Sequence, residues 1–259
     1  MAGFPLSCHE GSHRHSRKTE EKPVKLKELR EKVWRANLKL FEYRLAVLTW
    51  GNVSGLAREE GLVVIKPSGV PYSELKAEDM VIVDLEGQMV EGHLQPSSDT
   101  PTHLEIYRSF PEIGGLCHTH SPYATMFAQA ELEIPCLGTT HADYFFGPIP
   151  LTRHLTPEEI AENYERNTGK VIVEKLKGKE IMACPAILLP GHGVFTWGET
   201  PLKAVENALA LEEVARMALG TLLLSPGKEP LARELLLKHY YRRHGPRAYY
   251  GQKKGDGHE

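Results

Sequence analysis

The chain has few cysteines, no long apolar run and little excess charge, and each shortage excludes a class of protein. Its 259 residues include four cysteines, which are Cys8, Cys117, Cys136 and Cys184. No two lie close together, which excludes a disulfide framework and a cysteine-rich zinc knuckle. No stretch reaches the roughly 18 apolar residues of a membrane span, and the first residues lack the apolar segment of a signal peptide. The net charge of −3 argues against a surface that binds nucleic acid or an acidic membrane. We expect a protein of the reducing cytoplasm that binds neither nucleic acid nor a membrane.

The length and the apolar pattern predict one ordered domain between two tails. Residues 1–23 are polar and without periodicity, so we expect a disordered N-terminal extension. Residues 24–252 form the predicted domain, and residues 253–259 are expected to be a flexible tail. There is no internal repeat and no long linker. A content of 41% hydrophobic and 25% charged residues is enough for one sizeable core.

Helix and strand signals alternate along this domain. Apolar residues recur at helical spacing from Leu26 to Leu40, and the segment after Leu231 is helical at first. Short β-branched or apolar runs, typical of buried strands, lie at residues 63–65, 80–83, 113–117 and 187–189. Ser or Thr followed by Pro predicts helix starts at residues 100, 121, 156 and 200. The fold class is therefore α/β, a single domain with a central mixed β-sheet flanked by helices.

Two histidines at the end of one predicted strand are the clearest candidates for chemistry. Successive side chains of a strand point to opposite faces, so His118 and His120 project from the same face while Thr119 points away. A lone histidine among the 13 of this chain is more often an ordinary surface or core residue. A same-face pair at a strand end is instead a good pair of metal ligands. Imidazoles with a carboxylate suit zinc, and also manganese, cobalt or nickel.

Three turn-like segments, at residues 49–55, 66–70 and 95–99, combine glycine with small polar side chains. Each taken alone is more often an ordinary turn. A phosphate monoester needs converging backbone N–H groups and hydroxyl donors without bulk, together with a cation. The residues that supply these groups are Gly51, Asn52, Lys66, Ser68, Gly69, Ser97 and Ser98. Two of the serines directly precede Asp99, which predicts that a substrate phosphate and a metal share one pocket.

From about residue 24 to residue 252 the chain resembles the L-ribulose-5-phosphate 4-epimerases, a family of the class II metal-dependent aldolase and adducin-head superfamily. The resemblance lies in residues 48–54 (LTWGNVS), 66–70 (KPSGV), 96–103 (PSSDTPTH), 118–121 (HTHS), 138–145 (GTTHADYF), 239–240 (HY) and 248–252 (AYYGQ). The residues directly before His192 are less polar than in that family, and residues 1–23 have no counterpart in it.

The resemblance implies a class II aldolase-like fold and one divalent metal per subunit, Zn²⁺ first with Mn²⁺ or Co²⁺ as alternatives. The implied ligands are Asp99, His118, His120 and His192. Asp143 and Tyr250 would be the acid/base pair, and Tyr250 would reach into the neighbouring subunit of a four-fold homotetramer. The implied reaction interconverts L-ribulose 5-phosphate and D-xylulose 5-phosphate, in pentose phosphate metabolism such as arabinose catabolism, by cleaving and re-forming the C3–C4 bond.

Three other interpretations stay open. A class II sugar-phosphate aldolase of the L-fuculose-phosphate type shares the fold and metal site but releases two fragments. In such aldolases a glutamate resembles Asp99 in position, so the aspartate here, with Asp143 and Tyr250, favours the epimerase. A metal-dependent hydrolase of the His-x-His type usually needs a longer chain and more metal carboxylates. A non-catalytic, zinc-stabilised binding protein is disfavoured because structural zinc sites tend to be closed and rich in cysteine.

Overall fold

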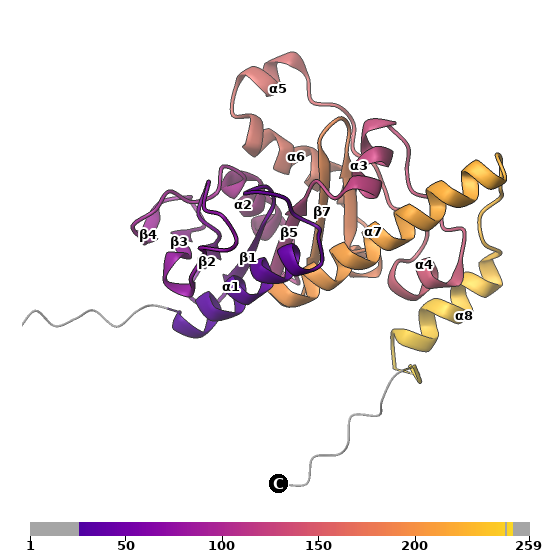
Figure 1. Cartoon of the computed structure of the whole chain (residues 1–259), viewed down its shortest axis with the longest axis horizontal. Coiled ribbons are helices and arrows are strands. Elements are labelled where there is room, and N and C mark those ends of the chain that lie inside the picture. The colour runs from indigo at the N-terminus through magenta and orange to yellow at the C-terminus, as the bar shows by residue number, and fades with distance from the viewer. Residues whose placement is uncertain (1–25, 247, 251–259) are drawn as a thin grey trace, which may run out of the picture.

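A computed structural model describes residues 26–246 and 248–250, in which helices cover both faces of one seven-stranded sheet (Figure 1). The strands are β1 (Asn52–Ala57), β2 (Leu62–Ile65), β3 (Val81–Asp84), β4 (Met89–Glu91), β5 (Gly115–Thr119), β6 (Ala186–Leu189) and β7 (Gly193–Gly198). Their order in the sheet is β4-β3-β2-β1-β5-β7-β6. The predictions for residues 1–23 and 253–259 lie outside the described residues.

Eight α-helices accompany these strands within the described part of the chain. They are α1 (Lys27–Glu42), α2 (Thr100–Ser109), α3 (Pro122–Gln129), α4 (Thr139–Tyr144), α5 (Pro157–Ala161), α6 (Tyr164–Leu176), α7 (Pro201–Leu224) and α8 (Arg233–Arg243). Two short 3₁₀ helices span Ala77–Asp79 and Ile181–Ala183. None of the helices in the described ranges is long and apolar enough to cross a bilayer.

The prediction of a single α/β domain with a helix-flanked central sheet is confirmed, but the strands pair antiparallel rather than in a mixed sheet. Every ladder between neighbouring strands is antiparallel. The one parallel contact among the described residues is an isolated bridge from Leu151 to Leu188. Continuous apolar runs usually mark parallel strands, because those are buried on both faces. Here helices bury both faces of an antiparallel sheet, which produces the same runs.

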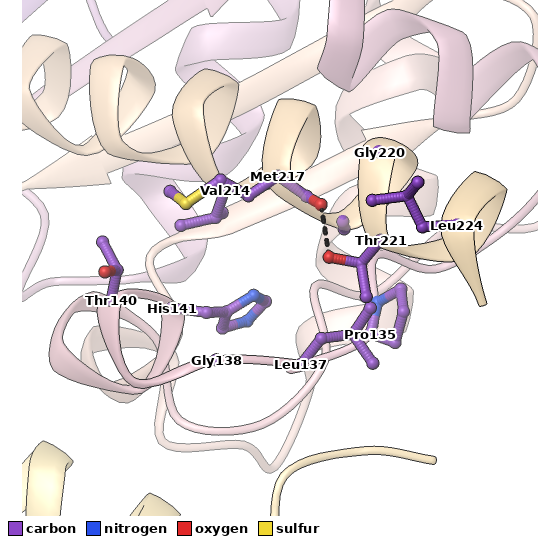
Figure 2. Close-up of a pocket in the computed structure, with 11 residues that line it drawn as sticks. Pro135, Leu137, Gly138, Thr140, His141, Val214, Met217, Gly220, Thr221 and Leu224 are labelled. Atoms are coloured by element: carbon purple, nitrogen blue, oxygen red, sulfur yellow. Dashed lines mark hydrogen bonds between the residues drawn. The ribbon is translucent and has the colours of Figure 1, made fainter. Parts of the chain in front are cut away.

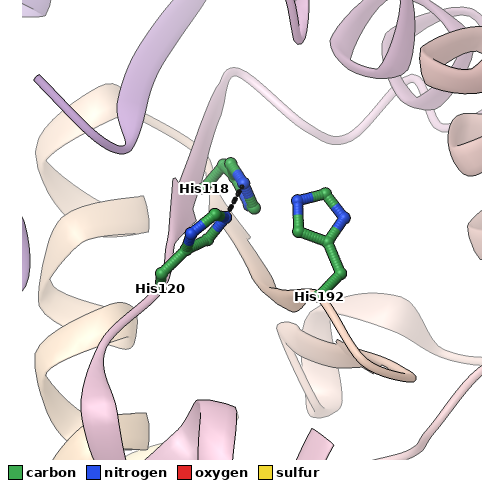
Figure 3. Close-up of side chains that lie close together, drawn as sticks. All are labelled: His118, His120 and His192. Atoms are coloured by element: carbon green, nitrogen blue, oxygen red, sulfur yellow. Dashed lines mark hydrogen bonds between the residues drawn. The ribbon is translucent and has the colours of Figure 1, made fainter. Parts of the chain in front are cut away.

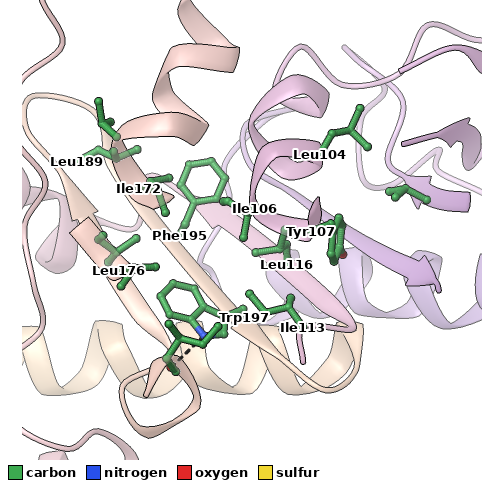
Figure 4. Packing of buried hydrophobic residues seen from close by; sticks show 14 of the residues in the cluster. Leu104, Ile106, Tyr107, Ile113, Leu116, Ile172, Leu176, Leu189, Phe195 and Trp197 are labelled. Carbon is green, nitrogen blue, oxygen red and sulfur yellow. Dashed lines mark hydrogen bonds between the residues drawn. The ribbon is translucent and has the colours of Figure 1, made fainter. Parts of the chain in front are cut away.

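Alternate residues of the strands face two different cores. Val63, Val83 and Leu116 pack with α2 and α6 on one side. Val64, Ile82 and Cys117 pack with α1 and α7 on the other. Figure 4 shows the first core, in which Phe195 and Trp197 of β7 lie against residues of both helices. The alternation along β5 continues to its end, so it determines the face on which His118 projects.

The segment 49–55, expected to be a turn, is mostly strand β1. Gly55 is not a turn residue, because a Cβ at this position would lie 2.8 Å from Pro201 and 2.9 Å from Leu29. The glycine therefore allows α1 and α7 to pack closely on the middle of the sheet. Gly51 lies in the loop directly before β1, with a left-handed φ of 73°. A Cβ there would be 2.9 Å from the backbone oxygen of His118, so this glycine brings the loop against the strand that carries the histidine pair.

The helix starts predicted from Ser/Thr-Pro pairs are all found, and two have the expected cap. The Thr156 hydroxyl accepts a hydrogen bond from the Glu159 backbone N–H, and the Thr200 hydroxyl accepts one from the Lys203 N–H. Ser121 precedes α3 as expected, but its side chain makes no capping hydrogen bond. The carboxylate of Glu212 on α7 caps this helix instead.

We predict that Glu212→Ala destabilises the protein. The two Glu212 carboxylate oxygens accept hydrogen bonds of 2.9 Å from the backbone N–H groups of Tyr123 and Ala124, and the side chain is 8% exposed. Removing it leaves two buried donors without partners, which costs about 3 kcal/mol of unfolding free energy. Chemical denaturation measures this loss. Glu213→Ala is the control, because the Glu213 side chain is 44% exposed and forms a surface ion pair with Arg216; equal effects of the two variants would contradict the prediction.

Candidate metal and substrate site

The histidine pair and His192 meet at one end of the sheet. β5 pairs with β7 and β7 with β6, so the tight turn between β6 and β7 lies beside the end of β5. His192 lies in that turn, where its backbone N–H donates to the Leu189 carbonyl. Figure 3 shows the three rings directed toward one another. One nitrogen from each of His118, His120 and His192 lies within 4.8 Å of the other two.

The donor set fits a divalent metal ion. The Nε2 atoms of His118 and His120 are 3.0 Å apart. Two ligands of a tetrahedral zinc ion at about 2.0–2.1 Å are about 3.3 Å apart, so this spacing is close to that of a ligand pair. The His118 Nδ1 atom lies 2.9 Å from the Val194 carbonyl, and this hydrogen bond assigns its proton to Nδ1 and leaves a lone pair on Nε2. The prediction that these three residues can hold a metal is supported.

Burial keeps two of the imidazoles in the neutral form that binds metals. Burial and the neighbouring His118 and His120 lower the pKa of His192 to about 4. Burial and His118 also lower the pKa of His120. Neutral rings at physiological pH do not have to lose a proton before they bind a cation.

Asp99 lies in the same cavity but outside the close group of three imidazoles. Its carboxylate accepts a 2.6 Å hydrogen bond from the Asn52 side-chain amide. The same amide donates to the Ser97 hydroxyl over 3.1 Å, so Asn52 connects two of the predicted segments. Burial acts to raise the pKa of Asp99, but His118, His103, Asn52 and His192 together lower it. The carboxylate is therefore ionised at neutral pH, and its role as a fourth metal ligand stays a prediction.

All seven residues predicted to bind phosphate line one cavity of about 380 Å³, together with the four predicted metal ligands. Lys66 is the cation of this group and is almost fully buried. Its ammonium donates weakly to the Pro67 carbonyl over 3.3 Å and lies 4.9 Å from the centre of the Tyr72 ring. Burial lowers the pKa of Lys66 to about 8. The cavity thus joins small polar loops, a titratable amine and a candidate metal centre.

Asp143 and Tyr250 do not line the cavity of their own chain. Asp143 lies on α4, where both of its oxygens accept hydrogen bonds from Arg242 of α8, at 2.8 and 2.5 Å. Burial acts to raise the pKa of Asp143, but Arg242 and His239 together lower it. The Arg242 guanidinium also lies 4.9 Å from the centre of the Tyr250 ring. The two predicted acid/base residues are therefore joined by one arginine, outside the cavity that holds His118, His120 and His192.

Two residues of the cavity, Tyr164 and Glu165, were not predicted from the sequence. They open α6, directly after Asn163, which has a left-handed backbone with φ of 58°. No motif marks them, because their place in the site depends on how α6 packs against α2.

A second cavity, of about 400 Å³, lies between α7 and the segment around α4 (Figure 2). Its lining is mainly apolar, and Figure 2 shows Met217, Val214 and Leu224 facing this space. Its one imidazole, His141, is hydrogen-bonded to the Gly147 carbonyl, and burial lowers its pKa to about 4. This cavity brings together no charged groups and contains none of the predicted site residues.

A family model described as Class II Aldolase and Adducin N-terminal domain matches residues 31–219. Among solved structures, an L-fuculose 1-phosphate aldolase is similar with a TM-score of 0.70 and 25% identity, over 83% of this chain and 95% of that one. YgbL from Klebsiella pneumoniae, described as a putative aldolase/epimerase/decarboxylase, has a TM-score of 0.65 and 25% identity, over 82% and 97%. L-fuculose-1-phosphate aldolase from Thermus thermophilus has a TM-score of 0.60 and 26% identity, over 76% and 96%.

Proposed function

Because the chain belongs to the class II aldolase and adducin N-terminal domain family, we propose that it is a metal-dependent enzyme that cleaves a carbon–carbon bond of a phosphorylated ketose by a retro-aldol step. The observation that carries this proposal is that the three imidazoles share one cavity with the Gly/Ser loops and Lys66. A cavity of this size that combines three imidazoles able to hold a metal with hydrogen-bond donors for a phosphate suits a small sugar phosphate.

The chemistry requires bond cleavage rather than simple proton exchange. In a 2-ketopentose phosphate, C4 lies two carbons from the carbonyl, so its hydrogen is not acidic. Removing the proton of the C4 hydroxyl lets its oxygen form a carbonyl while the C3–C4 bond breaks and its electron pair moves to C3 and the C2 oxygen. The products are an enediolate and glycolaldehyde phosphate. When bound, a divalent cation supplies Lewis acidity that stabilises the negative charge on the ketose oxygens.

Different residues of the chain hold the phosphate and transfer the protons. The backbone N–H groups and hydroxyls of the Gly/Ser loops, with Lys66, hold the phosphate. Asn52 orients the Asp99 carboxylate at the same time. We assign the proton transfers at the C4 oxygen to Asp143 and Tyr250 of a neighbouring subunit, since neither reaches the cavity of its own chain. This assignment requires a homo-oligomer, for which a four-fold tetramer is our prediction.

The fate of the aldehyde separates two candidate activities. Release of both fragments makes the enzyme a lyase, and the similar structures named as L-fuculose 1-phosphate aldolases favour that outcome. If the aldehyde instead stays bound, rotates and is attacked on its other face, the enzyme is a 4-epimerase. The aspartate at position 99 and the sequence around Asp143 and Tyr250 favour this second outcome.

Product analysis by ¹³C NMR distinguishes these activities. Metal-loaded enzyme is incubated with L-ribulose 5-phosphate and, separately, with L-fuculose 1-phosphate. D-xylulose 5-phosphate from the first substrate indicates an epimerase, whereas fragments that accumulate from either one indicate a lyase. Both results agree with retro-aldol cleavage. No turnover of either substrate by the metal-loaded protein would contradict the proposal.

We predict that Lys66→Met raises the KM for the phosphorylated substrate by about 10- to 100-fold. The loss of one charge-assisted hydrogen bond to the phosphate is worth about 1.5–3 kcal/mol. Methionine keeps the length and apolar character of the buried side chain. Steady-state kinetics at neutral pH measures the change; an unchanged KM would show that the amine does not contact the phosphate.

The KM of the wild-type enzyme is expected to rise as the pH passes about 8. Below that pH the Lys66 amine is charged, and above it the amine loses its proton because burial has lowered its pKa. A phosphate ester with a second pKa of about 6 is already a dianion there, so the change reports the lysine. In Lys66→Met this part of the pH dependence should be absent. A rise of equal size in both proteins would assign it to another group.

A further inference from the structure

Tyr164 contacts a candidate metal ligand and lines the same cavity. Its hydroxyl oxygen lies 3.2 Å from Nδ1 of His192, and the two ring centres are 6.1 Å apart. The residue lines the same cavity as Asp99 and Lys66. Its side chain is 37% exposed, so part of it faces solvent or a bound ligand.

The backbone around Tyr164 is fixed by contacts with α2. The Thr102 hydroxyl on α2 donates a 2.5 Å hydrogen bond to the Glu165 carbonyl. Gly169 allows α6 to pack closely on α2, since a Cβ there would lie 2.6 Å from Glu105. Because α2 starts directly after Asp99, these contacts hold Tyr164 at a defined position relative to the site.

The hydrogen bond between Tyr164 and His192 has only one possible direction when the site binds a cation. Figure 3 shows one ring nitrogen of His192 facing the other two histidines. Since Nδ1 is the nitrogen near Tyr164, the facing atom is Nε2, whose lone pair binds the cation. A neutral imidazole carries one N–H, which must then lie on Nδ1. The Tyr164 oxygen accepts that hydrogen, and its own O–H is free to donate elsewhere.

We propose that Tyr164 is a positioning residue for His192 that also donates its hydroxyl hydrogen to an oxygen of the bound sugar phosphate. The positioning role depends only on the three imidazoles. The contact with substrate rests on the proposed function. A hydrogen bond to the distal nitrogen of a metal-binding imidazole fixes its tautomer and ring orientation, and losing such a partner typically weakens metal binding about 10- to 100-fold.

The test is Tyr164→Phe, which removes one oxygen atom and keeps the ring. Tyr43→Phe is the matched control, because Tyr43 is 36% exposed and does not line the cavity. Zn²⁺ affinity is measured by competition with a chromophoric chelator. Co²⁺ quenching of Trp50, whose ring lies 6.4 Å from that of His120, gives a second readout. We expect binding of both ions to weaken about 10- to 100-fold in Tyr164→Phe and to be unchanged in Tyr43→Phe.

Three outcomes are decisive. Metal affinity in Tyr164→Phe within about twofold of wild type overturns the positioning role, whatever the activity; about twofold is only about 0.4 kcal/mol. Weaker metal binding with an unchanged KM at saturating metal overturns the contact with substrate, whereas a raised KM supports it. If the wild-type protein turns over no ketose phosphate, the proposed function fails, and the metal titrations still decide the positioning role.

Discussion

Replacing His118 with alanine is expected to remove the bound metal and the activity together. His118 is one of the three imidazoles of the site, with its Nε2 atom 3.0 Å from that of His120 and its ring centre 4.9 Å from that of His192. Without it, two imidazoles remain. Losing a hydrogen-bond partner of a metal ligand weakens metal binding by up to roughly 100-fold, so we expect the loss of a ligand itself to weaken metal binding by more than that. We expect metal analysis to find less than one tenth of the wild-type metal content, and kcat/KM to fall by at least about 10³-fold, because cation stabilisation is worth several kcal/mol.

The control for this variant is His93→Ala. His93 is exposed and its nearest charged partner is Asp79, so its loss should leave metal content and activity unchanged. Circular dichroism and thermal unfolding establish that both variants fold. A folded His118→Ala protein with a full equivalent of bound metal would show that the site lies elsewhere.

Asp143→Asn and Tyr250→Phe are each expected to lower kcat by about 10²- to 10⁴-fold while metal content stays at the wild-type level. Positioned acids and bases contribute rate factors of this size. Neither residue is near the imidazoles of its own chain, so metal binding should not change. Tyr249→Phe is the control for Tyr250→Phe, since it changes the neighbouring tyrosine. Wild-type kcat in both Asp143→Asn and Tyr250→Phe would dismiss the acid/base assignment.

Subunit mixing tests whether these residues act across an interface. His118→Ala chains are expected to lack the metal but keep Tyr250. Tyr250→Phe chains are expected to keep the metal but lack the tyrosine hydroxyl. Mixed oligomers formed by co-expression should recover part of the activity, because some sites combine an intact metal centre with an intact partner tyrosine. If the mixture is no more active than the two variants assayed separately, Tyr250 does not serve a neighbouring subunit.

The parts of the fold that could be predicted from the sequence are those determined by local chemistry. Helix starts followed from Thr-Pro and Ser-Pro pairs, and buried strands from β-branched runs such as that in β3. The antiparallel pairing could not be predicted, because it depends on which strands become neighbours after folding. The β1 strand was missed since its glycine and small polar residues are typical of turns. The structure explains the glycine by the close packing of Gly55 against Leu29 and Pro201.

In the site, too, residues determined by local sequence could be predicted, and residues placed by tertiary packing could not. The His118 and His120 pair was predictable because the alternation of a strand is local, and the glycine and serine segments that line the cavity were predictable from their composition. Tyr164 was not, since it reaches the site only through the packing of α6 on α2. The joining of Asp143 and Tyr250 by Arg242 also needed the structure, because residues about a hundred positions apart meet there. Residues brought together by tertiary packing leave no periodic signal in the sequence.

Metal titration of the stripped enzyme shows whether a cation bound by the histidines is needed for cleavage of the sugar phosphate. The protein is freed of metal with a chelator, shown to remain folded, and assayed with L-ribulose 5-phosphate and L-fuculose 1-phosphate as Zn²⁺, Mn²⁺ or Co²⁺ is added. We predict negligible turnover without metal and a rise that saturates at one equivalent per chain, with no such rise in His118→Ala. Full activity of the metal-free wild-type protein would contradict this prediction.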